Sequence, residues 1–217
     1  MAAPTISRAC RIRNPALFIC DIQEKFRPAI FEFNKLSSSL VNTTTKLLKA
    51  AGPLNIPIYV TTQSRAKLGD TVAELHPYTS PSTNSANVRA NIDKTFFSMI
   101  TPEIDAQLPS PRGENGPLDA IIVGIESHIC VTQTTLDLLE RGHRVYVIVD
   151  GVSSINPEER GVALARLRDA GAVVTSSESV MFEVMGDAKN EGFKEVSGVV
   201  KEMKEETKEA MGILARI

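Results

Sequence analysis

In Leu17-Phe18-Ile19-Cys20-Asp21, four apolar residues run without a break into an acidic one, a pattern that indicates a buried strand. Similar apolar runs recur further along the chain, at residues 56–60, 120–123, 145–149 and 172–174. They are continuous rather than alternating, which is typical of strands that are buried on both faces of a parallel sheet.

Segments of helical spacing separate these runs. An apolar repeat from Leu36 to Ala51 ends at Gly52-Pro53, another helix is expected from about Cys130 to Arg141, and a third runs from Asn156-Pro157 to Gly171. Strand and helix in alternation predict an α/β fold with a doubly wound, mostly parallel sheet of about six strands. Helices should cover both faces as an α/β/α sandwich, because right-handed crossovers place them there.

Three parts are predicted along the 217 residues: a flexible leader at 1–13, one domain at 14–187 and an amphipathic tail at 188–217. In the tail, apolar residues recur at spacings of three and four, at Phe193, Val196, Val200, Met203, Thr207, Ala210 and Leu214. Such a stripe predicts a helix that either docks on its own domain or contacts another subunit.

Two further segments interrupt the alternation of strands and helices. Residues 63–87 are rich in Ser, Thr, Asn and Pro, and they form either a lid or pocket wall or a surface insertion. Residues 109–117 look like an exposed loop.

The composition excludes several classes of partner. A net charge of −2 with mixed signs gives no basic surface for nucleic acid or an anionic membrane. No apolar run approaches the ~20 residues of a membrane span. Three widely spaced cysteines without a CxxC motif indicate free thiols in a reducing compartment. A cytoplasmic protein is therefore predicted; arginines at 8, 11 and 13 raise the mitochondrion as the alternative.

Two polar features follow buried strands at the edge where open parallel sheets bind ligands. Asp21 follows the first strand, and Gly124-Ile125-Glu126-Ser127-His128-Ile129-Cys130 follows a later one, with Cys130 opening the next helix. The unpaired N–H groups of a helix start favour a thiolate and can stabilise an oxyanion. This position indicates a nucleophile, whereas a lone cysteine elsewhere is usually a small buried hydrophobe, as we interpret Cys20 and Cys10.

Three blocks in this order resemble the isochorismatase-like (cysteine hydrolase) family over about residues 14–187. They are Ala16-Leu17-Phe18-Ile19-Cys20-Asp21-Ile22-Gln23-Glu24-Lys25-Phe26, Asp93-Lys94-Thr95-Phe96-Phe97-Ser98, and the segment from Gly124 to Thr134. The resemblance implies an isochorismatase-like, Rossmann-like fold with a catalytic triad of Asp21, Lys94 and Cys130. It also implies a non-proline cis peptide at Ile125–Glu126, and an oxyanion hole formed by the backbone N–H groups of Glu126 and Cys130.

Departures from the family pattern narrow the chemistry. Nicotinamidases carry an Asp-x-His and further histidines after the second strand, whereas this chain has only His76 nearby. One histidine cannot build a site that needs three or four ligands, so neither a metal nor another cofactor is expected. The family layout places Phe26, Gln63, Phe97 and His128 around a small-molecule substrate. Core packing is an alternative explanation for either Phe.

The resulting prediction is a metal-independent cysteine hydrolase that cleaves a C–N bond of a small amide or carbamoyl compound through a Cys130 thioester. A homo-oligomer is also predicted. The alternatives are a non-catalytic binding or scaffold protein and a redox-responsive thiol protein on the same fold. Cys20 is expected to be a poor partner for an oxidised Cys130, because neighbouring side chains of a strand point in opposite directions.

Overall fold

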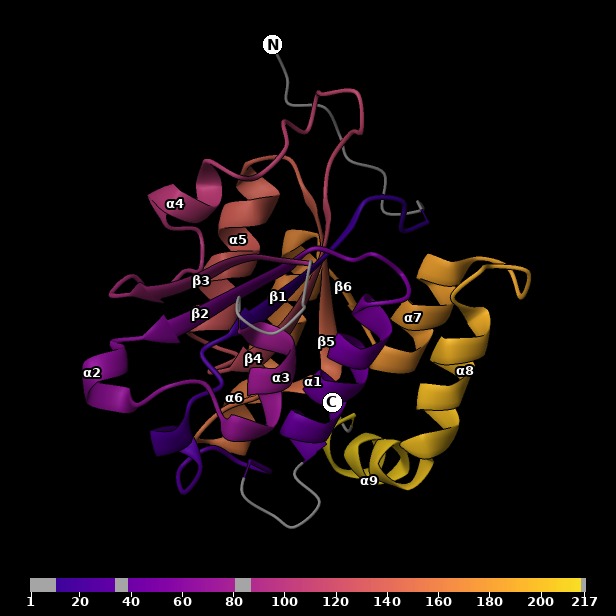
Figure 1. The fold of residues 1–217 in the computed structure, drawn as a ribbon. Helices are drawn as coiled ribbons and strands as arrows, with labels where there is room; N and C mark the ends of the chain where they lie inside the picture. The colour runs from indigo at the N-terminus through magenta and orange to yellow at the C-terminus, as the bar shows by residue number, and fades with distance from the viewer. Residues whose placement is uncertain (1–10, 34–38, 81–86, 216–217) are drawn as a thin grey trace.

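The computed structural model describes residues 11–33, 39–80 and 87–215, and its six strands form a single parallel sheet (Figure 1). The strand order is β3-β2-β1-β4-β5-β6, and every neighbouring pair is parallel. The strands are β1 (Pro15–Cys20), β2 (Ile58–Gln63), β3 (Val88–Lys94), β4 (Asp119–Ile125), β5 (Arg144–Ser153) and β6 (Val173–Thr175). The predicted doubly wound sheet is confirmed.

Helices cover both faces of this sheet (Figure 1). One face carries α4 (Pro102–Asp105), α5 (Cys130–Glu140) and α6 (Pro157–Ala170). The other carries α1 (Ser39–Ala51), α7 (Ser177–Met185), α8 (Phe193–Glu202) and α9 (Lys204–Leu214). Short helical turns lie in the connections: η1 (Glu24–Phe26), α2 (Arg65–Leu68), η2 (Ala73–Leu75) and α3 (His76–Thr79). No helix in the described ranges is both long and apolar enough to cross a membrane.

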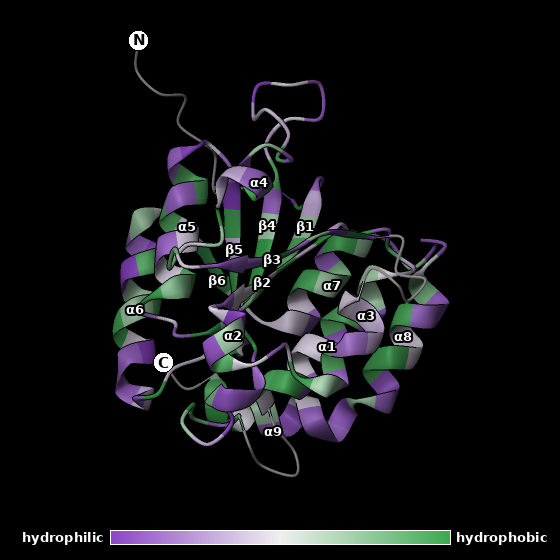
Figure 2. Ribbon diagram, turned by 60° about the vertical axis from the view of Figure 1, so that its left-hand side comes forward, coloured by the Kyte–Doolittle hydropathy of each residue, from purple (hydrophilic) through white to green (hydrophobic). Residues whose placement is uncertain are grey.

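The continuous apolar strands supply two cores, one on each face. In β1, Leu17 and Ile19 pack with α1 and α7, whereas Phe18 and Cys20 pack with the layer that contains α5 and α6. Figure 2 shows the result: hydrophobic strands lie at the centre, and the helices carry hydrophilic residues outward. An alternating pattern would have left one face polar, so the sequence pattern correctly indicated burial on both sides.

The order of the strands creates the ligand site. From β1, the chain adds β2 and then β3 on one side of the sheet. It then returns to add β4, β5 and β6 on the other side, so the direction in which strands are added reverses between β1 and β4. In open parallel sheets, ligands bind outside the carboxyl ends of the strands at such a point. Asp21 and Glu126 directly follow these two strands.

Strand β3 was missed by the sequence analysis. Its sequence, Val-Arg-Ala-Asn-Ile-Asp-Lys, is largely polar, because β3 is an edge strand with partial exposure along its length. Edge strands need no apolar residues on both faces, so a search for continuous apolar runs does not detect them.

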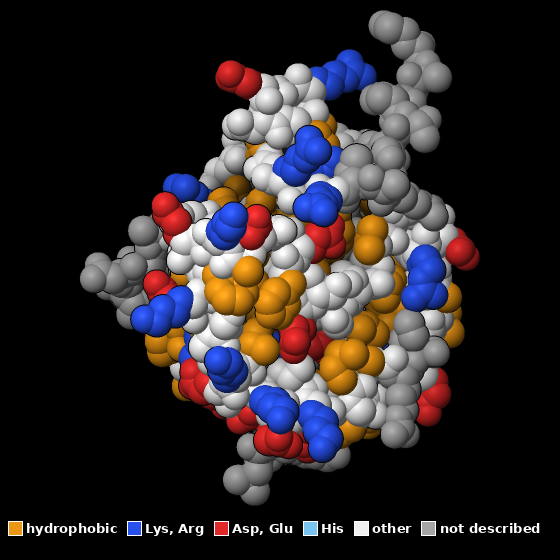
Figure 3. All heavy atoms as spheres, turned by 90° about the vertical axis from the view of Figure 1, so that its right-hand side faces the viewer, with side chains coloured by type: hydrophobic (Ala, Val, Ile, Leu, Met, Phe, Trp, Pro, Cys, Tyr) orange, Lys and Arg blue, Asp and Glu red, His pale blue; other side chains and the backbone are white. Residues whose placement is uncertain are grey.

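The C-terminal tail forms two helices and not one. Met203 interrupts the helix between α8 and α9. Four residues of the predicted apolar stripe are buried: Val196, Met203, Ala210 and Leu214. Helix α9 packs on α1 and β5 of the same chain. Lys46, itself buried, donates to Thr207 Oγ1 at 2.8 Å. The tail therefore docks in cis. Figure 3 shows the side of the molecule that carries α8, where hydrophobic side chains are interspersed with charged ones.

The remaining predicted segments are partly described. Residues 1–10 of the leader, Leu36 and residues 81–86 lie outside the described residues. Ile12 is buried in the core, so the ordered part of the chain begins before residue 14. Residues 109–117 contain no helix or strand, as predicted.

Residues 63–80 are packed against the body of the domain, with Val72, Leu75 and Thr79 buried. The backbone N–H of Val72 donates to Ile22 O, and that of Glu24 donates to Asp70 O. These contacts favour the pocket wall over the surface insertion for this part of the segment.

Arg160 provides a test of the tail docking. It is buried in α6 and donates to the carbonyl oxygens of Val149, Val152 and Leu214. Arg160→Met should lower the free energy of unfolding by about 3 kcal/mol, because buried carbonyl groups lose their donor. Urea denaturation measures this loss. Arg166→Met, at an exposed position of the same helix, is the control and should change stability little; equal effects of the two changes would contradict the docking.

Candidate active site

Asp21 lies at the carboxyl end of β1 and is almost completely buried. Its backbone is left-handed, with φ of 54°, so the chain turns sharply as it leaves the strand. Thr61 Oγ1, at the end of the neighbouring β2, donates to Asp21 Oδ1 at 2.8 Å. Lys94 Nζ donates to Asp21 Oδ2 at 2.7 Å. Both carboxylate oxygens are therefore engaged in a site that excludes water.

Lys94 is the last residue of β3, and its side chain is fully buried. Besides Asp21, its ammonium group donates to Gln63 Oε1 at 2.8 Å and to the carbonyl oxygens of Phe96 and Phe97 at 3.0 and 3.2 Å. Burial alone would lower the pKa of Lys94, but the anionic forms of Cys20, Asp21 and Cys130 raise it above its ordinary value. Lys94 thus stays cationic beside two thiols.

Cys130 is the first residue of α5 and is 6% exposed. Within the described part of the chain, no backbone or side-chain acceptor receives a hydrogen bond from the backbone N–H of Cys130 or of Glu126. Unpaired donors at a helix start attract negative charge. The thiol, the Lys94–Asp21 ion pair and two unpaired N–H groups thus lie at the carboxyl ends of β1, β3 and β4.

The predicted cis peptide at Ile125–Glu126 is not present: every peptide bond that the structure describes is trans. The chain reverses by another device, a left-handed backbone at Glu126 with φ of 54° after Gly124 with φ of 141°. Two unusual dihedral angles can redirect a strand end as a cis bond does. The N–H of Glu126 is left unpaired without a cis bond.

Cys20 is buried, as interpreted from the sequence, but the expectation that its side chain points away from that of Asp21 was wrong. The left-handed turn at Asp21 breaks the alternation of the strand, so Asp21 Oδ2 lies 3.6 Å from Cys20 Sγ. Cys20 faces the layer of α5 and packs in the same cluster of buried residues as Cys130. Both thiols therefore belong to the site.

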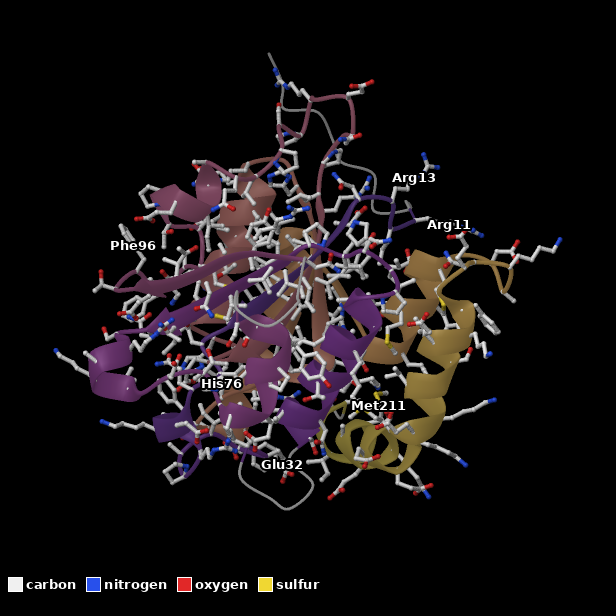
Figure 4. The ribbon with its side chains drawn as sticks, viewed as in Figure 1. Arg11, Arg13, Glu32, His76, Phe96 and Met211 are labelled. Carbon is white, nitrogen blue, oxygen red and sulfur yellow. The ribbon has the colours of Figure 1, made fainter. Side chains whose placement is uncertain are left out.

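The predicted substrate-binding residues separate into different groups. Gln63 holds the site together, since its amide also donates to Thr95 O at 3.0 Å. Phe26 packs against the core on the α1 side of the sheet. The ring of Phe97 is half exposed, and that of neighbouring Phe96 points away from the body of the molecule (Figure 4).

His128 lies beside the carboxyl group of Glu126, with Nδ1 3.5 Å from Glu126 Oε2 and 3.3 Å from Ser154 Oγ. His128 lies in the turn between β4 and α5, next to Ser154, which follows β5, and it forms no hydrogen bond or ion pair with Asp21 or Lys94. Burial raises the pKa of the Glu126 carboxyl. The backbone N–H of Ile155 and the charge of His128 act in the opposite direction but offset this increase only in part.

Sequence reasoning missed two supporting residues, Thr61 and Gln23. Gln23 is fully buried; its amide donates to Gln63 O and Gly69 O and accepts from the N–H of Gln63. This side chain joins the segment after Asp21 to the end of β2. A signal was available for Thr61: it is a polar residue within a buried strand, at the end that faces the site.

The family model of the isochorismatase domain matches residues 15–179. This chain belongs to the isochorismatase family. The match includes Asp21 after β1, Lys94 at the end of β3 and Cys130 at the start of α5.

Relatives within the isochorismatase family cover most of the chain. The secreted isochorismatase effector Isc1 of Phytophthora sojae is 39% identical over 86% of this chain and 84% of its own length. Isochorismatase domain-containing protein 2 of Xenopus laevis is 38% identical over 88% of this chain and 85% of its own. The solved structure of MAR1 ribonuclease from Caenorhabditis elegans superposes with a TM-score of 0.77 at 38% identity, covering 88% of this chain and 92% of that one.

Within the described ranges, no three His, Cys, Asp or Glu side chains are grouped so that they could hold a metal ion. His76, the histidine nearest to the site in the sequence, has its Nε2 atom 2.7 Å from Thr71 O.

Gly124 tests the close approach of β4 to β1. A Cβ at this position would lie 2.2 Å from Cys20 O and 2.5 Å from Cys20 Cβ, in a backbone conformation that favours glycine. Gly124→Ala should therefore destabilise the fold by about 3 kcal/mol or more, as measured by urea denaturation. Gly161→Ala is the matched control, because its Cβ meets nothing within 4 Å on a helix. That change should stabilise by up to about 1 kcal/mol; a mild effect at Gly124 would contradict the geometry.

Glu126 predicts a pH dependence of stability. Because burial raises the pKa of its carboxyl, the folded state binds this proton more tightly than the unfolded chain does. Its contribution is thus complete below the ordinary pKa and is lost as pH rises through the folded pKa. Glu126→Gln should be more stable than wild type at pH 8 and comparable at pH 4, in urea denaturation at both values. Glu191→Gln, at an exposed site, controls for the substitution. A difference that is the same at both pH values would contradict the prediction.

Proposed function

We propose that this protein is a metal-independent thiol hydrolase that cleaves a C–N bond of a small amide or carbamoyl compound through a thioester on Cys130. Membership of the isochorismatase family supports a hydrolase. The observation that carries the finer proposal is the buried Lys94–Asp21 ion pair at 2.7 Å, placed beside a thiol that opens a helix. A structural core gains little from such a pair, because desolvation offsets most of the attraction between the charges.

The proposed reaction begins with transfer of the Cys130 proton to Asp21. The thiolate attacks the carbonyl carbon, and the N–H groups of Glu126 and Cys130 receive the negative charge on oxygen. The C–N bond then breaks, and Asp21 gives its proton to the leaving nitrogen. Water attacks the thioester while Asp21 accepts a proton from it, and the carboxylic acid and the thiol are released. Lys94 holds Asp21 in place and favours the anionic forms.

The burial of the site supports a small substrate. Cys130 is 6% exposed, and Asp21 and Lys94 are less exposed still. Only a slender group such as a primary amide can reach a thiol at that depth. The half-exposed Phe97 and the polar pair of His128 and Glu126 are proposed to contact the rest of the substrate.

Ribonuclease activity is a second candidate, since the name of the C. elegans relative describes one at 38% identity. The site chemistry favours it less. RNA binding requires cations that face the phosphates, whereas the Lys94 ammonium is buried among oxygen atoms of its own chain. The net charge of −2 also gives little attraction for a polyanion.

An exposed apolar tail would have favoured a scaffold protein that binds a partner. The apolar stripe of α8 and α9 is instead buried against its own domain, so the tail gives no support to that alternative. Cytoplasmic location and a homo-oligomer stay predictions.

The reactivity of Cys130 tests the proposal without a known substrate. Iodoacetamide should alkylate Cys130 rapidly at pH 6, and peptide mass spectrometry measures the rate of this labelling. In Lys94→Met the rate at pH 6 should fall at least about tenfold, since a nearby cation shifts the thiol equilibrium by a unit or more. Lys208→Met, at an exposed position of α9, is the control.

Two additions complete this experiment. Asp21→Asn combined with Lys94→Met avoids an unpaired buried charge and should be equally slow. Ammonia release from a panel of small amides, and cleavage of a single-stranded RNA, then compare the two candidate functions. Slow labelling of wild-type Cys130 until pH approaches about 8.5, the ordinary thiol value, would contradict the thiolate.

A further inference from the structure

Cys20 and Cys130 form a pair of free thiols in one buried site. Cys20 is completely buried and ends β1; Cys130 is nearly so and begins α5. The two belong to the same packed cluster on the α5 face of the sheet, and Cys20 Sγ lies 3.6 Å from Oδ2 of Asp21, the partner of Lys94.

The backbone keeps these two residues close. Cys20 is paired in register with Gly124 on the adjacent β4, and the chain reaches Cys130 only six residues later, after a tight turn at Glu126. A side chain at Gly124 would collide with Cys20, so the absence of a Cβ there permits the approach. Strand register therefore holds Cys20 beside the strand end that leads to Cys130.

The two thiols differ in their surroundings. Burial first, and then the contact with Cys130 and the charge of Asp21, raise the pKa of Cys20, so this thiol stays protonated. Its hydrogen points toward Asp21 Oδ2, 3.6 Å from the sulfur. Cys130 instead lies at a helix start with Lys94 nearby. One sulfur is thus suited to react first, and the other has a base ready to take its proton.

We propose that Cys20 and Cys130 form a reversible disulfide when a small hydroperoxide oxidises the site, and that this modification switches the nucleophile off. The oxidant is hydrogen peroxide or an organic hydroperoxide small enough to reach a buried sulfur.

The electrons balance in two steps. The Cys130 thiolate, whose proton has passed to Asp21, attacks the outer oxygen of the peroxide: an S–O bond forms and the O–O bond breaks. The leaving oxygen takes the proton back from Asp21 and is released as water or an alcohol. Cys130 is then a sulfenic acid. The Cys20 sulfur attacks the Cys130 sulfur as Asp21 takes the Cys20 proton. The S–S bond forms, the S–O bond breaks, and hydroxide leaves with that proton as water. A dithiol reductant reverses the modification.

This proposal does not depend on which substrate the enzyme cleaves. If Cys130 alkylates slowly at pH 6 but still joins Cys20 under peroxide, the hydrolase proposal fails and the disulfide stands. If alkylation is rapid and no disulfide forms, the reverse holds.

The experiment uses the full chain treated with a small excess of hydrogen peroxide. Remaining thiols are blocked, and the protein is digested without reductant and mapped by mass spectrometry. The expected product is a linked pair of peptides containing Cys20 and Cys130, lighter by two hydrogens than the separate peptides. Labelling of Cys130 by iodoacetamide should be lost, and dithiothreitol should restore it fully.

Two variants supply the controls. Cys10→Ser removes the third cysteine and should leave the disulfide unchanged. Cys20→Ser should yield Cys130 sulfinic acid, which dithiothreitol does not reduce, so labelling is lost permanently. Cys20→Ala serves the same purpose if the serine variant does not fold.

The wild-type peptide map decides the question even without variants. Peroxide treatment that produces a Cys130 sulfinic acid, a disulfide to Cys10 or a link between two chains, with no Cys20–Cys130 peptide, would overturn the proposal.

Discussion

The buried ion pair between Lys94 and Asp21 is the interaction on which the rest of the site depends. It joins the end of edge strand β3 to the end of β1 across β2, through an ammonium group that also holds Gln63 and the carbonyl groups after β3. Removing either charge would leave the other buried without a partner, which costs about 3–5 kcal/mol. The pair is therefore both a clamp on the sheet and a fixed electric field at Cys130.

Much of this arrangement was predictable from the sequence. Continuous apolar runs gave a parallel sheet, and a parallel sheet brings Asp21 and Cys130 to one edge whatever the details of the helices. Lys94 was not predictable in this way, because its polar edge strand has no apolar signature. It was found only through resemblance to a family, and family membership is now shown by the match to residues 15–179.

The errors have a common physical origin in backbone conformation. Simple strand alternation placed Cys20 away from Asp21, but a left-handed residue directly after the strand reverses that direction. The turn before Cys130 likewise uses left-handed Glu126 in place of a cis bond. The tail breaks at Met203, although the spacing of its apolar residues continues across the break. Side-chain patterns report burial well, whereas single unusual dihedral angles leave little trace in a sequence.

Two sulfurs, one carboxylate and one ammonium group thus share a site that is nearly closed to solvent. The same features that favour attack by a thiolate also favour its oxidation, since both reactions begin with a nucleophilic sulfur. A reducing compartment would keep such a site active.

Capture of an acyl group tests the central claim, that Cys130 attacks carbonyl carbon, most directly. A small activated ester such as p-nitrophenyl acetate is mixed with the protein, quenched in acid and mapped by mass spectrometry. A nucleophilic Cys130 should carry a single acetyl group that is labile to hydroxylamine and absent in Lys94→Met. Acetyl groups spread over surface lysines with Cys130 unmodified would contradict it.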